Sequence, residues 1–202
     1  MSNKNFIFNT NSSFSEVINS GELREFLILI DKSWEYIMDF SQILGNSSVR
    51  IVVLIMCDNS KIKLNIKNYI NWVNEINKTN ILNFAKNGEV DIMSELEIDD
   101  KWAGSKWELH IENIFLGENV KISGVPRLNI KLDKTRANHS LKALKIKDED
   151  LFYLSSRWLS EDSSKFILLK WKIQALLDLF ENKDKEMESE IMEKFEGFIK
   201  NN

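Results

Sequence analysis

The spacing of hydrophobic positions between residues 14 and 44 predicts helix. Apolar side chains recur there at intervals of three and four residues, as one face of a helix requires. They are Phe14, Val17, Ile18, Leu23, Phe26, Leu27, Ile30, Trp34, Ile37, Met38 and Ile43. A second amphipathic helix is expected after residue 60, with Ile66, Tyr69, Ile70, Val73 and Ile76 on its apolar side. Between the two, residues 49–57 form an apolar, β-branched run that predicts a strand buried on both faces.

The pattern changes to alternation of apolar and polar residues after Gly88. Residues 90–92, 107–112, 120–122 and 128–132 follow this period of two, which is typical of strands with one exposed face. Glycines at 104, 117 and 124 separate these segments as turns or bulges. We therefore predict three or four antiparallel strands between about residue 88 and residue 132.

From Asp148 onward the hydrophobic spacing is helical again. The strongest stripe consists of Phe166, Leu169, Ile173, Leu176, Leu177 and Phe180. No internal repeat or linker is recognisable, so we predict one domain over residues 1–202. Its parts are helices and the buried strand at 14–80, the antiparallel sheet at about 88–132 and C-terminal helices at about 148–200. The predicted fold class is α+β, with a central buried strand and an antiparallel sheet flanked by N-terminal and C-terminal helices.

Composition supports a folded chain with a real core. Of the 202 residues 43% are hydrophobic and 10% aromatic, and the formal net charge is −4. The N-terminus lacks the pattern of a secretory signal, and no apolar run approaches the roughly 18 residues that span a bilayer, so we predict a cytoplasmic protein. Abundant Asn, Lys and Ile with a single proline indicate a bacterial or phage origin.

Charge is distributed unevenly along the sequence. Residues 121–147 hold eight basic side chains against one acidic residue, Asp133, which makes this segment +7 in a chain of net −4. Such a segment binds nucleic acid, binds an acidic protein, or has no external partner because its cations face the acidic helices of the same chain or only solvent. The candidate binding residues in it are Lys121, Arg127, Lys131, Lys134, Arg136, His139, Lys142 and Lys145.

Two tryptophans, Trp102 and Trp107, flank Gly104 in a short connection. Tryptophan in such a position is either a hot spot for a partner or a lid over the core. We include both residues among the binding candidates.

Signatures of catalysis are missing from the sequence. No phosphate loop, dinucleotide motif or hydrolase elbow occurs, so no catalytic residue and no cofactor are predicted. The single cysteine, Cys57, allows no intramolecular disulfide and reads as a small buried hydrophobe. No metal is predicted. The weak alternative is a metal site formed by the carboxylates of Asp58 and Glu108 and the imidazole of His110. The simpler interpretation is that Asp58 is a turn residue and that Glu108 and His110 lie on the solvent-exposed face of a strand.

These observations favour a non-enzymatic function through contacts with another protein. Our first hypothesis is a protein-binding or accessory subunit in a bacterial or phage cytoplasm, a class that includes toxin-neutralising and defence-related subunits. The alternative is a nucleic-acid-binding or nucleic-acid-processing protein that uses the basic 121–147 segment. The last helix has a narrow apolar seam, which offers a route to a homodimer. No membrane partner is predicted.

Overall fold

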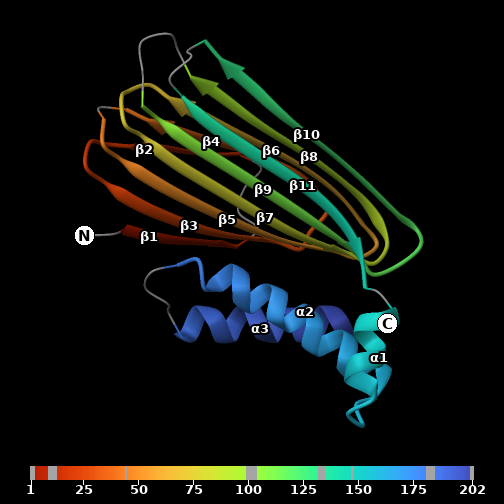
Figure 1. Cartoon of the computed structure of the whole chain (residues 1–202). Coiled ribbons are helices and arrows are strands. Elements are labelled where there is room, and N and C mark those ends of the chain that lie inside the picture. The colour runs from red at the N-terminus through yellow and green to blue at the C-terminus, as the bar shows by residue number, and fades with distance from the viewer. Residues whose placement is uncertain are drawn as a thin grey trace.

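The chain folds into a parallel β-solenoid with a helical layer on one side (Figure 1). The computed structural model describes residues 3–8, 13–43, 45–98, 104–131, 135–146, 148–180 and 185–200. Sheet A contains, in spatial order, β1 (Asn3–Phe8), β3 (Leu23–Ile30), β5 (Ser48–Cys57), β7 (Ile76–Ala85), β9 (Lys106–Phe115) and β11 (Arg136–Lys145). Sheet B contains β2 (Ser13–Ile18), β4 (Trp34–Gln42), β6 (Ser60–Ile70), β8 (Gly88–Ile98) and β10 (Val120–Ile130).

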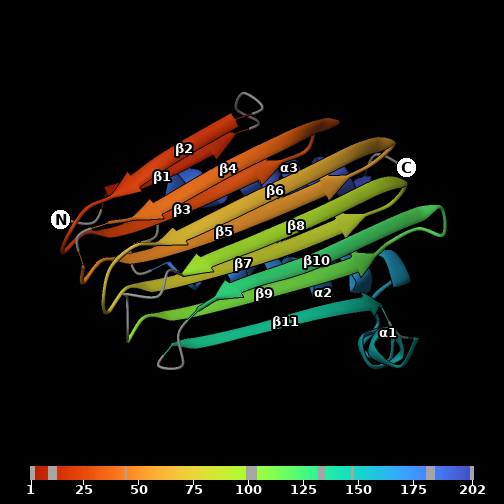
Figure 2. The ribbon, with the colours of Figure 1, turned by 90° about the horizontal axis from the view of Figure 1, so that it is seen from above.

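All neighbouring strands in both sheets run parallel. Parallel neighbours need a long crossover connection, and here each crossover is a strand of the opposite sheet. One strand of each sheet therefore makes one rung, and successive rungs stack side by side (Figure 2). Equivalent residues lie in register along the stack, as Ser48, Ile76, Lys106 and Arg136 do in sheet A.

This architecture shows that the predicted fold class was wrong. Residues 14–43 form three strands with the turns between them, and the residues of the second expected helix lie in β6, in the turn that follows it and at the start of β7. Strands do occur between residues 88 and 132, but they are parallel, and they belong to two sheets. Helices occur after residue 147 as the spacing indicated, although they lie on a solenoid and not beside an antiparallel sheet. Whether the chain is a single domain stays a prediction.

The main core fills the space between the two sheets. Inward-pointing side chains of consecutive rungs stack on one another, such as Val53 with Ile28 and Ile81 in sheet A. In sheet B, Ile62, Leu64 and Ile66 of β6 point inward, while the residues between them face outward. The alternation in sheet B follows from its solvent-facing outer side.

The outer face of sheet A is covered along part of its length by helices. These are α2 (Glu161–Leu177) and α3 (Lys185–Lys200), while α1 (Asp148–Ser155) packs against α2. A second hydrophobic cluster joins Leu54 and Phe84 of the sheet to Ile173 of α2 and Phe195 of α3. Strand β5 is thus buried on both faces, which confirms the prediction for residues 49–57.

Polar side chains hold the corners at which the chain leaves sheet B and enters sheet A. Ser47 and Glu75 occupy equivalent positions in two consecutive corners, and both are buried. One carboxylate oxygen of Glu75 accepts hydrogen bonds from the Ser47 backbone N–H at 2.9 Å and from Gln42 Nε2 at 3.0 Å. The Glu75 N–H donates to Ser105 Oγ at 3.3 Å in the next corner. These bonds align the starts of successive sheet A strands.

Candidate functional site

The basic segment forms the last rung of the solenoid. Strands β10 and β11, called here the terminal rung, lie at the ends of sheet B and sheet A. Six of the candidate cations are on these strands or directly after β10, and all are exposed: Lys121, Arg127, Lys131, Arg136, Lys142 and Lys145. His139 on β11 is exposed as well. Lys134 lies outside the described residues.

The cations project from opposite faces of the rung. Lys121 and Arg127 alternate with the inward residues of β10 and therefore point outward from sheet B. Arg136 and Lys142 point outward from sheet A in the same way. His139 is the register partner of Leu109, whose side chain points into the core. His139 therefore lies at the open end of the core. The cations are thus distributed over both outer faces of the terminal rung.

Within the described ranges, Lys121, Arg127, Arg136, Lys142 and Lys145 form no ion pair with a carboxylate of the chain. Three acidic residues of the preceding rung pair with cations outside the terminal rung. Glu89 is 2.9 Å from Lys61, Glu108 is 3.2 Å from Lys78, and Glu112 is 2.5 Å from Lys172 of α2. These five cations are therefore not neutralised by ion pairs, although Lys145 lines the same cavity as Glu161 and Asp162 of α2.

Apolar side chains of the terminal rung are only partly covered. Val120, Ile122, Ile130 and Ala137 pack against the main core, but Leu128 and Leu141 remain 40% and 48% exposed. In the rungs behind them, the equivalent residues Leu96 and Ile111 are buried. The end of the core is therefore open, whereas free-standing solenoids usually cap it with a polar segment.

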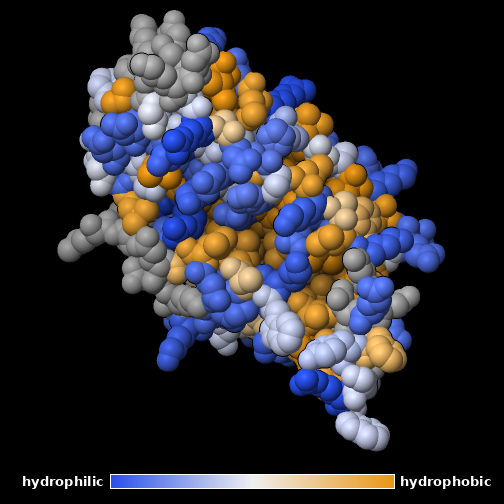
Figure 3. All heavy atoms as spheres, viewed as in Figure 1, coloured by the Kyte–Doolittle hydropathy of each residue, from blue (hydrophilic) through white to orange (hydrophobic). Residues whose placement is uncertain are grey.

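A shallow apolar groove of about 300 Å³ adjoins this end. It lies between the outer face of β11 and helix α2, and its apolar walls include Ile114, Leu144, Leu168 and Trp171. Figure 3 shows hydrophobic side chains between hydrophilic ones on this side of the molecule, where sheet A meets the helices. The groove extends the apolar surface of the terminal rung towards the helical layer.

The structure does not place the two predicted tryptophans together on a surface. Trp107 is 0% exposed, because its position in β9 points into the core beside Leu109 and Ile111. Its expected role as a surface contact is therefore corrected to that of a core residue. Trp102 lies outside the described residues.

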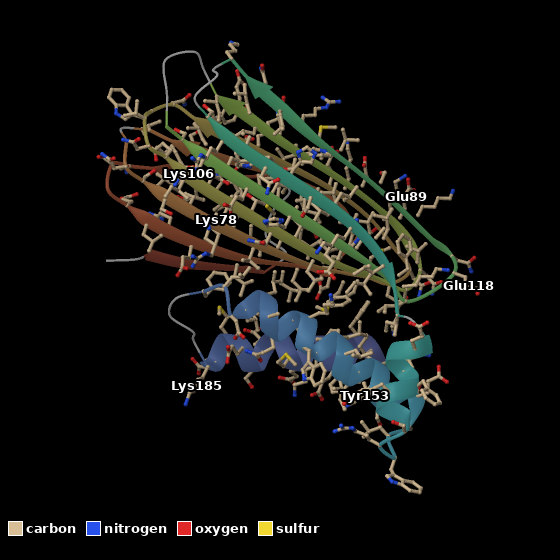
Figure 4. All side chains as sticks on the ribbon, in the orientation of Figure 1. Lys78, Glu89, Lys106, Glu118, Tyr153 and Lys185 are labelled. Carbon is tan, nitrogen blue, oxygen red and sulfur yellow. The ribbon has the colours of Figure 1, made fainter. Side chains whose placement is uncertain are left out.

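Exposed aromatic side chains occur instead at α1 and the turn after it. Phe152 and Tyr153 of α1 are exposed, and Trp158 is 99% exposed (Tyr153 is labelled in Figure 4). By contrast, Leu151 and Leu154 of the same helix are buried. Spacing alone could not reveal this patch, because α1 is short and touches little of the protein.

The three residues of the weak metal alternative are not assembled. Asp58 lies in the turn that follows β5, whereas Glu108 and His110 lie on the outer face of β9. Glu108 pairs with Lys78, and His110 Nδ1 is 2.7 Å from Ser140 Oγ. Across the described part of the chain, no group of three His, Cys, Asp or Glu side chains is close enough to hold a metal ion.

Cys57 is buried at the end of β5, next to the turn that leads into β6. Burial raises the pKa of its thiol, which lowers the fraction of reactive thiolate at neutral pH. We expect a thiol reagent to label Cys57 in the folded protein about tenfold or more slowly than in protein unfolded in denaturant. Following the reaction by absorbance tests this, and equal rates in both states would contradict the buried position.

Comparison with known proteins gives one family match. Residues 84–170 match the family described as SUF system FeS cluster assembly, SufBD core domain. The matched region runs from the end of β7 into α2 and includes the whole terminal rung. It covers less than half of the chain. No curated protein matches the sequence. In the described residues no helix is long and apolar enough to cross a membrane.

Proposed function

We propose that this chain is a non-enzymatic accessory subunit of a protein complex that acts in FeS cluster assembly. The observation that carries the proposal is the open, cationic terminal rung. It combines unpaired positive charge, partly exposed leucines and the free edges of two sheets, which together are typical of a protein-binding surface. The family match supports the process, since it spans this same rung.

The residues of the chain favour a supporting role over that of a cluster carrier. FeS clusters are held mainly by several cysteine thiolates. This sequence has one cysteine and two histidines in total. Cys57 is buried in the corner after β5, while His110 and His139 are exposed on strands β9 and β11. In this proposal the cluster is cargo handled by the complex, and partner chains supply the ligands.

The placement of the cations gives the nucleic-acid hypothesis no further support. A duplex is bound by a continuous stripe or groove of positive charge. Here Lys121 and Arg127 point away from sheet B, while Arg136 and Lys142 point away from sheet A. No single face of the terminal rung carries all four of these cations.

Affinity purification of the tagged protein from its host tests the proposal. We expect one other polypeptide at fixed stoichiometry, with iron and acid-labile sulfide in the complex after anaerobic isolation. Removal of the gene should also lower the activity of host FeS enzymes. A protein that elutes alone at low salt, together with unchanged FeS enzyme activity in the deletion strain, would refute the proposed function.

A further inference from the structure

The apolar outer face of sheet A extends one strand beyond the helices that cover it. Met56, Phe84, Ile114 and Leu144 lie in register on four consecutive strands and form one row. The first three side chains are at most 3% exposed and belong to the cluster shared with the helices, whereas Leu144 on β11 is 36% exposed. The row therefore continues past the edge of the helical layer. Leu144 lines the groove of about 300 Å³ between β11 and α2.

This groove, called here the β11–α2 groove, has an apolar base and an apolar rim. Ile114 and Leu169 line it and are buried, so their side chains lie at its base. Leu144 and Trp171 line it from the strand and the helix and are exposed, so they form its rim. Figure 3 shows hydrophobic side chains on this side of the molecule, with hydrophilic ones around them. An apolar body that enters the groove thus meets an apolar surface on several sides.

The apolar surface at the groove is narrow, because the adjacent outward row of sheet A becomes charged. In that row Leu54 and Leu82 are followed by Glu112 and Lys142. A stable protein–protein interface covers about 800 Å² on each partner, far more than one apolar row offers. Sites for small molecules begin at about 300 Å³, and the groove has this volume. Its size therefore favours a small molecule over a protein as its occupant.

Positive charge exceeds negative charge beside the groove. Lys145 and Lys172 line it. Glu112 is 2.5 Å from Lys172 and is also the register partner of Lys142, so this single carboxylate faces two lysines. Within the described ranges, Lys142 and Lys145 form no ion pair with a carboxylate. The charge beside the groove is therefore complementary to an anion.

The carboxylates of α2 line a neighbouring cavity and not the groove itself. This cavity, of about 360 Å³, shares Lys145 with the groove and is also lined by Glu161 and Asp162. Glu161 is 2.5 Å from Lys165 of the same helix. An anionic head group is therefore favoured at the side of the groove that faces Lys142 and Lys172, away from these carboxylates.

We propose that the β11–α2 groove binds a small amphipathic carboxylate. Its apolar body lies between Leu144 and Trp171, and its head group lies near Lys142 and Lys172. An alkyl-chain carboxylate and an aromatic carboxylate share this chemistry, since a narrow apolar slot accepts a chain or a flat ring. This inference concerns a different surface from that of the proposed function and does not depend on it.

Isothermal titration calorimetry of the purified chain with decanoate, and separately with 2-naphthoate, tests the inference. We expect at least one of them to bind with 1:1 stoichiometry and a Kd of about 0.1 mM at low salt. The tighter of the two identifies the apolar body as a chain or as a ring. Salt at about 0.5 M should weaken the binding, because it screens the lysines.

A substitution within the groove tests the position of the apolar body. Leu144→Asp places a carboxylate on the rim and should weaken binding about tenfold or more. The matched control is Val125→Asp, which makes the same change of charge at a 51% exposed position on the outer face of sheet B. Trp171→Ala changes a side chain that is 60% exposed and provides a second test, should Leu144→Asp not fold.

Removal of the lysines tests the position of the head group. Lys142→Gln, Lys172→Gln leaves Glu112 beside the groove and should weaken binding about tenfold or more. The control Lys121→Gln, Arg127→Gln removes two exposed cations from β10 and should bind as wild type does.

Three results would overturn the inference. They are the absence of binding by either ligand up to about 1 mM, binding by the groove variants as tight as that of wild type, and equal weakening in groove variants and controls. Circular dichroism verifies that each variant is folded. Because the assay needs only the purified chain, its failure leaves the test of the proposed function unaffected.

Discussion

Replacing Gly88 by alanine is expected to lower the free energy of unfolding by about 3 kcal/mol or more. Gly88 starts β8 at the corner between the sheets, with φ of +117°. A β-carbon there would lie 2.1 Å from the backbone oxygen of Ser60 and 3.1 Å from the sulfur of Cys57. Backbone strain and steric overlap therefore add, and neither Ser60 nor Cys57 can move without disturbing β6 or the core. Denaturant unfolding followed by circular dichroism measures the loss.

The control for this prediction is Gly21→Ala. Gly21 also has a positive φ, +72°, but nothing lies within 4 Å of its added β-carbon. That variant isolates the backbone cost and should lose only about 1–2 kcal/mol. Equal losses in the two variants would show that the close packing of the corner at Gly88 contributes nothing.

Helix was predicted for residues 14–44 in part because β3, which is buried on both faces, carries apolar residues at nearly every position. In β3, Phe26 and Ile28 point into the main core, while Leu27 and Leu29 face the helical layer. A run of this kind contains intervals of three and four residues by default. Spacing alone cannot separate it from a helix. The run at residues 49–57 avoided the ambiguity because it is β-branched and bounded by turn residues.

The solenoid itself leaves a faint repeat in the sequence. Asn59, Asn87 and Asn119 precede the equivalent positions Ser60, Gly88 and Val120, and alternating residues follow each of them. The intervals of 28 and 32 residues are unequal, and the rungs share little beyond this turn and the alternation. Short glycine-containing connections then suggested hairpins. In the structure these short connections join a strand of one sheet to a strand of the other sheet, so they do not form hairpins.

The candidate site was more accessible to sequence reasoning than the fold was. Net charge identified the 121–147 segment, because like charges concentrated in one stretch need no three-dimensional information to be counted. Counting charges could not show which residues of neighbouring strands lie opposite each other. Only the pairing of β8 with β10 and of β9 with β11 shows that Arg127 lies opposite Glu95 and Lys142 opposite Glu112. Burial of Trp107 likewise depends on which face of β9 is turned inward.

The helical layer should depend strongly on Phe195 of α3. Its ring is fully buried, 5.4 Å from the ring of Phe84 in β7 and 5.9 Å from that of Phe166 in α2. Phe195→Ala removes a contact shared by three elements and leaves a cavity in the cluster that joins helices to sheet A. We expect a loss of about 3–5 kcal/mol in the free energy of unfolding, measured by denaturant titration.

Hydrogen exchange should show which helices and strands the Phe195→Ala substitution destabilises. Amides of α2 and α3 are expected to lose protection in Phe195→Ala before those of β5 and β7, because the main core between the sheets does not contain Phe195. The matched control is Phe152→Ala, since Phe152 is 76% exposed on α1 and its removal should change stability by no more than about 0.5 kcal/mol. Equal losses in the two variants would contradict the role of Phe195 in this cluster. If strand amides lose protection together with helix amides, the helices and the solenoid unfold as one unit. The helical layer would then be an integral part of the body that supports the terminal rung.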